Sequence, residues 1–345
     1  MGPYVIVALV AMWLSRSFWF PGRYVVGFDT YAYSGPNVEV TEAAWRDFRL
    51  PILNDLIFGG VPHLGNPSAG SMYAPQLVTL VIGTNRGMGI LVALHLVVLG
   101  LGMVWLTRRL GIGRIGATAA GLILVASGAM LTKTIQYEQI LVIAWAPLLL
   151  VAIHAVLNNE RPRRAIGGMS AVTATILLAG HPQLVYETLL LAVAATIGFA
   201  IGGERWRRLP HLAGGAVLGA MIALPQLVAV VVATSDSALS LGRNQDLLNP
   251  QLAMLPNSTA RALLGTVQNS DPARFVGSFE SIAFIGVVGA VLAVIGITDA
   301  VMKPQRRPWA ISFVVIGVLA VVWAMGPRTF VFDTSAPAGD AVIRG

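Results

Sequence analysis

Residues 88–107, MGILVALHLVVLGLGMVWLT, decide the fold, because they contain no Asp, Glu, Lys or Arg. A helix of about 20 apolar residues is long enough to cross the hydrocarbon core of a bilayer. The run is followed by RRLGIGR, residues 108–114, whose arginines are costly in lipid and favoured at its surface. The stretch therefore predicts a membrane span that ends in a basic loop.

The composition of the whole chain agrees with this interpretation. Of 345 residues, 56% are hydrophobic and 11% are charged, whereas a soluble domain carries about 25% charged residues. The high hydrophobicity excludes a disordered chain, and the Gly and Pro residues follow no fixed collagen-like period. The absence of Cys excludes disulfides, thiolate metal sites and cysteine nucleophiles. A polytopic membrane protein remains.

Apolar runs predict an all-α membrane protein with about nine transmembrane helices. They form one transmembrane domain, residues 1–326, followed by a tail at 327–345 that reads as the start of a longer region. No internal repeat is visible, which disfavours an inverted-repeat transporter. The nine runs are 3–20, 88–107, 112–131, 139–157, 165–179, 182–202, 211–233, 280–300 and 309–326.

Basic residues gather in alternate short loops and predict the orientation. Twelve of the 23 Lys and Arg residues lie near 108–114, 161–164, 205–208 and 303–307. Short basic loops stay cytoplasmic, so we expect a cytoplasmic N-terminus and an extracytoplasmic C-terminus in a bacterial plasma membrane. The net charge of +7 is then explained by topology and by contact with membrane lipids, not by nucleic acid.

Two long loops, 21–87 and 234–279, fall on the extracytoplasmic side. In the first, an apolar stripe predicts an amphipathic helix on the membrane surface. The stripe consists of Val40, Ala43, Ala44, Phe48, Leu53 and Leu56. The Gly- and Pro-rich segment that follows predicts ordered turns or a flexible loop. Residues 77–82 are too short to span and fit a re-entrant piece.

Two acidic residues at the ends of predicted spans are candidate catalytic groups. Asp29 follows the first span, where a carboxylate is reachable by water and can act as a general base; a loop carboxylate that caps a turn is the simpler alternative. Glu138 begins the fourth span, where a plain helix N-terminal acid explains it equally well.

Polar residues in the same loops are candidates for sugar or phosphate binding. Gln183 and Glu187 would share a helix face beside Tyr186 if a helix starts near Pro182, although a turn with Pro at its first helical position is an equal alternative. The scattered histidines show no metal-ligand spacing, so no metal site is assigned, while an Asp-bound divalent ion stays open. The candidates are His63, Asn66, Tyr73, Lys133, His181, Gln183, Tyr186, Glu187 and Arg243.

Several segments together resemble known families. The segment GFDTYAYSGP, which contains Asp29, resembles the acidic first-loop motif of GT-C glycosyltransferases. The segment GGVPHLGNPSAGSMYAPQL resembles the G-x-P-x-x-x-N-P…Y-x-P segment of bacterial YfhO-like membrane proteins, on Pro62, Asn66, Pro67, Tyr73 and Pro75. SGAMLTKTIQYEQILVIAWAPLLL, AGHPQLVYETLLLA and FVGSFESIAFIGVVG are similar to later segments of that family, whose members are much longer than this chain.

The resemblance implies a membrane glycosyltransferase of GT-C type. Such an enzyme takes sugar from a polyprenyl-phosphate-linked donor and transfers it to a cell-envelope glycan or lipid on the extracytoplasmic side, with the acid at the position of Asp29 as catalytic residue. No further cofactor is implied. A transporter or flippase of a lipid-linked saccharide is the main alternative, with His95 and His154 as deep polar candidates, and a non-catalytic subunit is the third.

Overall fold

The computed structural model describes residues 1–20, 29–201, 205–235 and 287–303, with isolated residues at 23, 27, 285, 307 and within 310–318. This part of the chain is all-α apart from one small hairpin. Its longer helices are α1 (Gly2–Leu14), α3 (Gly35–Arg46), α5 (Thr84–Arg109), α6 (Arg114–Ala126), α9 (Ala146–Leu157), α10 (Pro162–Leu178), α11 (Pro182–Ile201), α12 (Leu209–Ser235) and α14 (Val287–Met302).

Shorter elements connect these helices. They are the α-helices α2 (Arg16–Trp19), α4 (Val78–Ile82), α7 (Gly128–Lys133) and α8 (Tyr137–Ile143), the π-helical turn η1 (Thr30–Ser34), the 3₁₀ turns η2 (Pro67–Ala69), η3 (Ala74–Leu77) and η4 (Trp206–Arg208), and the antiparallel strands β1 (Leu53–Asn54) and β2 (Val61–Pro62).

Four helical segments in the described part are long and apolar enough to cross a membrane: Thr84–Arg109, Tyr137–Leu157, Pro182–Ala200 and Trp206–Ser235. They support a multi-pass all-α membrane protein, and the predicted count of nine spans stays a prediction. Most of the ninth run, the loop 234–279 after Ser235 and the tail 327–345 lie outside the described residues.

Three predicted runs are interrupted in the structure. The run 3–20 breaks at Ser15, whose hydroxyl donates back to the Ala11 carbonyl at 2.8 Å. The run 112–131 breaks at Ser127, which is extended and whose hydroxyl accepts the Met130 N–H at 3.2 Å as a helix cap. The run 139–157 is divided into α8 and α9 near Trp145. Serine competes with the helix for backbone hydrogen bonds, and hydropathy does not register this.

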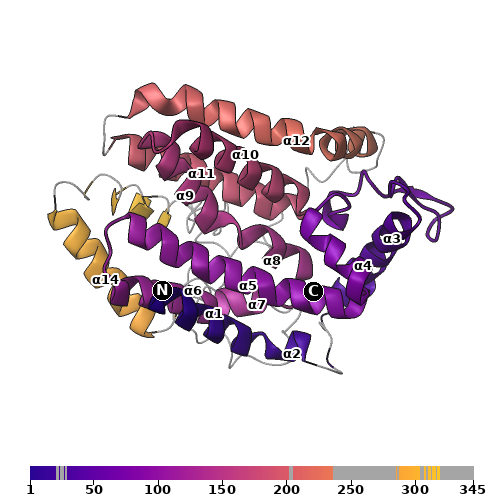
Figure 1. The fold of residues 1–345 in the computed structure, drawn as a ribbon, viewed down its shortest axis with the longest axis horizontal. Helices are drawn as coiled ribbons and strands as arrows, with labels where there is room; N and C mark the ends of the chain where they lie inside the picture. Colours follow the sequence, from indigo (N-terminus) through magenta and orange to yellow (C-terminus); the bar gives the residue numbers. More distant parts are fainter. Residues whose placement is uncertain are drawn as a thin grey trace, which may run out of the picture.

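The helices pack side by side around α5 (Figure 1). α5 contacts α1, α6, α8 and α9, and α10 packs closely along α12. Apolar side chains from α5, α8 and α9 fill the core, with Leu96, Ile140 and Ile153 completely buried. Glycine permits the close contacts: at Gly219 of α12 an added Cβ would lie 2.6 Å from Thr173 Cβ on α10.

The bundle has two chemically different ends. One end, called the basic end here, carries the turns with Arg108, Arg109 and Arg114 and with Arg161–Arg164, and an ion pair of 2.6 Å joins Arg109 to Glu160 across these turns. The other end, called the α3 end, carries α3 and α4 at the right of Figure 1. Two of the four predicted basic loops thus lie together at one end, and the predicted orientation stays a prediction.

The amphipathic helix predicted in the first long loop is shorter than expected. α3 ends at Arg46, and the apolar residues Phe48, Leu53 and Leu56 lie in or before the β1–β2 hairpin. Phe48 has a φ of 54°, in the left-handed region, which ends the helix. The Gly- and Pro-rich segment is ordered and contains η2 and η3, and residues 78–82 form the short helix α4.

Candidate functional site

The segment that carries Asp29 lies against the residues that precede α8. Thr30 Oγ1 donates a hydrogen bond of 2.9 Å to the Ile135 carbonyl. A Cβ added at Gly27 would lie only 2.5 Å from the same carbonyl oxygen, so this approach needs glycine. Asp29 itself is exposed, directly before η1. These contacts join two segments that are over 100 residues apart in the chain.

Ser34 connects the Asp29 segment to Glu138. Its hydroxyl donates a short hydrogen bond to Glu138 Oε1 and lies 3.4 Å from the Asp29 carbonyl oxygen. Ser34 and Glu138 are 2% and 7% exposed, so this is a buried contact to a carboxyl group, where a missing partner is costly. The Asp29 and Glu138 side chains are close enough for their charges to interact. Two carboxyl groups thus share one end of the bundle, one exposed and one buried.

Tyr33 brings the 61–75 loop to the same place. Its hydroxyl donates a hydrogen bond of 2.8 Å to Asn66 Oδ1, which also accepts the Ser68 N–H at 3.1 Å as the cap of η2. Partial burial raises the pKa of Tyr33, and the nearby Glu138 charge raises it further, so the hydroxyl stays protonated and can donate. Asp29, Tyr33, Ser34, Asn66 and Glu138 are called the first-loop site below.

The loop that presents Asn66 is held by its neighbours. Gly180, with a φ of 95°, lies between α10 and α11, and a Cβ there would be 2.9 Å from the Pro67 carbonyl oxygen. The Met72 N–H donates to Gln226 Oε1 of α12 at 3.2 Å, and Gln226 is 2% exposed. The position of Asn66 is therefore set by the α10–α11 turn and by α12.

Two predicted ligand-binding residues of this loop point into the protein. His63 is buried and its Nε2 lies 2.8 Å from Thr41 Oγ1 of α3; burial lowers its pKa. Tyr73 is also buried, and its hydroxyl accepts from Trp145 Nε1 at 2.7 Å and contacts His95 Nε2 at 2.5 Å. Burial raises the pKa of Tyr73. Both residues support the loop from inside and do not form a ligand-facing surface.

The remaining predicted binding residues belong to other elements than the first-loop site. Lys133 is partly buried on α7 and donates to Gln136 Oε1 at 3.3 Å, two residues before Glu138.

The residues predicted at the start of α11 lie on and before that helix, which begins at Pro182 as predicted. On its exposed face Gln183 Nε2 donates to Glu187 Oε1 at 2.9 Å, beside the half-exposed Tyr186. His181 has a φ of 46° and its Nδ1 accepts the Leu184 N–H at 3.3 Å, which caps α11. Arg243 lies outside the described residues.

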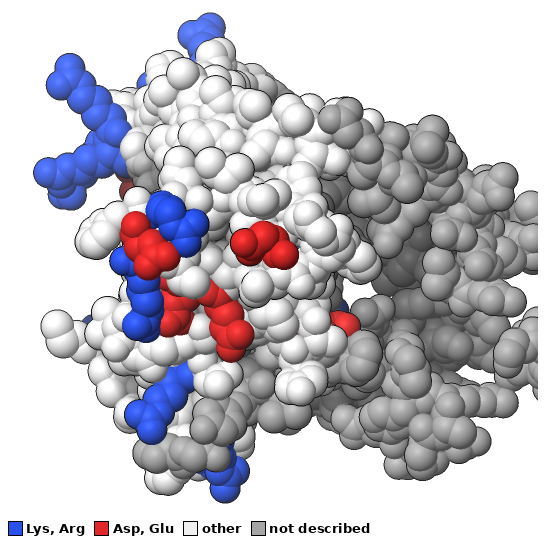
Figure 2. Space-filling view, turned by 90° about the vertical axis from the view of Figure 1, so that its right-hand side faces the viewer, with Lys and Arg blue, Asp and Glu red and all other residues white. Residues whose placement is uncertain are grey.

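A second polar feature of the α3 end is a groove between α3 and the α4–α5 junction. Its volume is about 560 Å³, and it is lined by Glu39, Glu42, Ala43, Arg46, Ile82, Gly83, Thr84, Asn85 and Arg86. Figure 2 looks onto this end, where acidic and basic side chains lie next to each other.

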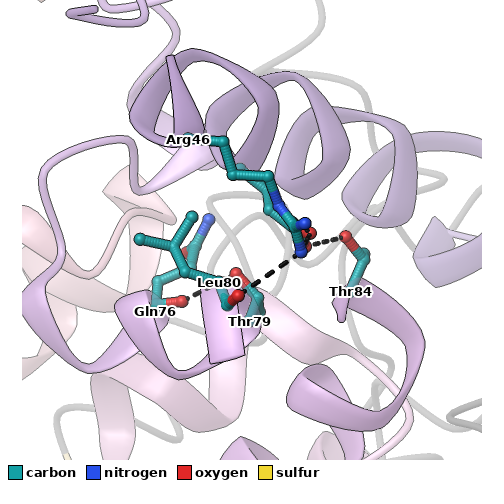
Figure 3. A network of polar contacts seen from close by, with 6 residues as sticks. Arg46, Gln76, Thr79, Leu80 and Thr84 are labelled. Atoms are coloured by element: carbon teal, nitrogen blue, oxygen red, sulfur yellow. Dashed lines mark hydrogen bonds and ion pairs between the residues drawn. The ribbon is translucent and has the colours of Figure 1, made fainter. Parts of the chain in front are cut away.

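Internal bonds occupy the charged residues in the middle of this groove. Glu42 accepts hydrogen bonds from Arg46 at 2.6 Å and from Thr84 Oγ1 at 2.5 Å. Arg46 also donates to the Leu80 carbonyl at 3.4 Å (Figure 3). These bonds fasten α3 to α4 and to the start of α5.

Tyr33 and Ser34, the two residues that join the site together, were not among the predicted site residues. Their one sequence signal is that they follow Asp29 by four and five residues in FDTYAYSGP. Among the described residues no group of three His, Asp or Glu side chains could hold a metal ion. Comparison with protein-family models, with characterised proteins and with solved structures gave no match.

Proposed function

We propose that this chain is a membrane glycosyltransferase that moves a sugar from a polyprenyl-phosphate-linked donor to a cell-envelope glycan or lipid. One observation carries the proposal: the segment of Asp29, the acid that matches the GT-C first-loop motif, is hydrogen-bonded to Glu138 through Ser34 and to the Asn66 loop through Tyr33. These are the acids and the loop that the sequence singled out separately. A site at one end of the helices suits a donor whose lipid tail stays in the bilayer.

The reaction needs a base, a leaving group and an orientation for the sugar. The acceptor hydroxyl oxygen attacks C1 of the donor sugar while the Asp29 carboxylate takes its proton, and the bond between C1 and the phosphate oxygen breaks. Polyprenyl phosphate leaves with the bonding electrons. General base catalysis of this kind contributes about 10²–10⁴-fold in rate. Asp29 is suited to this role because it is exposed to an incoming acceptor.

The other residues of the first-loop site position the reactants. Tyr33 and Asn66 provide a hydroxyl and an amide to a sugar at the exposed rim, and Lys133, on the segment that leads to Glu138, supplies a cation for the departing phosphate. Glu138 and Ser34 hold the Asp29 segment in place. We also propose that the α3 end is extracytoplasmic in a bacterial plasma membrane, because the opposite end carries the basic turns.

A transporter of lipid-linked saccharides is the alternative function. A transport pathway would need polar groups that face a passage within the spans. His95 instead has Nδ1 at 2.6 Å from the Leu91 carbonyl and Nε2 on the Tyr73 hydroxyl, in the core. Scrambling of a lipid-linked sugar in proteoliposomes without formation of a glycan product would support the transporter.

The test is sugar transfer by Asp29→Asn, measured with a polyprenyl-phosphate donor and the purified protein in proteoliposomes. We expect transfer to fall by about 10²–10⁴-fold, because the amide cannot accept the proton. The matched control is Asp55→Asn, another exposed carboxylate of the same long loop, which should transfer normally. Normal transfer by the Asp29 variant would remove its assigned role, and absence of transfer by the unaltered protein with any donor would reject the function.

A further inference from the structure

The segment from Phe48 to Gly60 exposes large apolar side chains at the α3 end. Phe48 and Phe58 are 98% and 94% exposed, and Leu56 is 79% exposed. Leu50, Ile52 and Leu53 are each more than half exposed as well. Soluble surfaces rarely expose so many large apolar residues in one short stretch. Their exposure points to an apolar environment that surrounds this segment.

The segment is an ordered hairpin. Leu53 pairs with Pro62 and Asn54 with Val61, and the Ile52 carbonyl accepts the His63 N–H at 2.8 Å. The Leu56 N–H donates to Asn54 Oδ1 at 3.1 Å, which fixes the turn. These bonds pair part of the hairpin backbone internally while the apolar side chains are exposed, and the exposed Asp55 carboxylate lies beside Leu56 at the tip, as in a segment that lies in the polar headgroup layer and does not cross the membrane.

The hairpin base lies beside the end of α12, a helix that can cross the membrane. A Cβ added at Gly65 would lie 2.5 Å from Ala233 Cβ and 2.8 Å from the Ala229 carbonyl oxygen, so the two backbones touch. On the same turns of α12, Val228, Val231 and Val232 are more than half exposed, as lipid-facing residues are. The hairpin therefore starts beside a candidate span whose last turns expose apolar side chains.

The distance from this contact to the hairpin tip is short. The Ile52 carbonyl is hydrogen-bonded to the N–H of His63, which lies two residues before Gly65. From Ile52 to Leu56 an extended chain covers at most about 14 Å. Each headgroup layer of a bilayer is roughly 5–8 Å thick, and amphipathic segments sink about 5–10 Å into the boundary. A hairpin that starts at the end of a span can therefore reach this layer along its length.

We propose that residues 48–60 form a membrane-interface anchor, in which Phe48, Leu56 and Phe58 insert among the lipid headgroups and upper acyl chains next to α12. The occupant of this apolar surface is the bilayer, because the hairpin adjoins a loop that contacts the last turns of a candidate span with exposed valines. Arg46 and Arg49 precede the hairpin and are ion-paired with Glu42 and Asp47, so the anchor rests on its apolar side chains. The anchor does not depend on the proposed glycosyltransferase activity.

The absence of Cys from the chain makes a direct test simple. Leu56→Cys and Phe58→Cys are each labelled with a nitroxide, and the protein is reconstituted into phosphatidylcholine vesicles that contain phosphatidylglycerol. Electron paramagnetic resonance then compares collisions with oxygen, which concentrates in lipid, and with a water-soluble nickel chelate. Val231→Cys on α12 serves as the lipid-facing control, and Glu39→Cys on the α3 groove serves as the water-facing control at the same end.

We expect both hairpin labels to collide more often with oxygen than with the nickel chelate, as the label at Val231 does. The label at Glu39 should collide more often with the nickel chelate. Nickel collisions at both hairpin positions equal to those at Glu39 would overturn the anchor. Dipolar broadening between hairpin labels, lost on dilution with unlabelled protein, would show a second copy of the chain as the occupant and would also overturn it. Both positions are exposed, so the labels replace no packed side chain.

Discussion

The hydrogen bond between Ser34 and Glu138 gives the sharpest stability prediction. Ser34→Ala removes the hydroxyl that donates to the buried Glu138 carboxyl group. A buried acceptor that loses its partner costs about 1–3 kcal/mol, with the upper part of that range for charged groups. We therefore expect the free energy of unfolding, measured in detergent micelles titrated with sodium dodecyl sulfate, to fall by about 1–3 kcal/mol.

The chain contains a matched control for this measurement. Ser71 is equally buried, at 1% exposed, and its hydroxyl has no hydrogen-bond partner among the described residues. Ser71→Ala should therefore change the unfolding free energy by less than about 0.5 kcal/mol or stabilise the protein. Equal costs for the two serines would refute the reasoning.

Two further predictions concern the loop that presents Asn66. Tyr73→Phe leaves Trp145 Nε1 and His95 Nε2 without their partner, so the unfolding free energy should fall by about 1–3 kcal/mol for each orphaned group; a loss below about 1 kcal/mol would contradict the network. Burial lowers the pKa of His63 below its ordinary value of 6.5, so the unfolded chain takes up the proton first. Stability should then decrease as the pH falls below about 6.5 and be retained above it, and His63→Gln should flatten this decrease in an unfolding series across that range.

The long apolar helices could be predicted because lipid imposes a simple rule of length and polarity on a span. The run 88–107 is contained in α5, and Pro182 begins α11 as expected. The hairpin at 53–62 could not be predicted, because its apolar spacing also fits a helix and the difference rests on the left-handed backbone at Phe48. The hydropathy of the runs also gave no signal for the helix breaks at Ser15 and Ser127.

The candidate site was only partly predictable for a related reason. Asp29, Asn66 and Glu138 carry distinctive chemistry and stood out in the sequence, whereas Ser34 is a residue type common in any turn. His63 and Tyr73 share a loop with Asn66, yet they are buried and Asn66 faces Tyr33. Which side of an irregular loop faces inward depends on contacts with α3, α10 and α12, and no periodic pattern encodes these contacts.

The most direct test of the central claim is a structure of the protein in lipid nanodiscs with a non-hydrolysable polyprenyl-phosphate sugar. The account predicts density for the sugar at the first-loop site, with its hydroxyls near Tyr33 and Asn66 and its C1 facing the side on which Asp29 lies. An acceptor hydroxyl in reach of C1 would then approach within about 3–3.5 Å of it. Sugar density in the α3 groove, or along a passage through the helices and away from Asp29, would contradict the account.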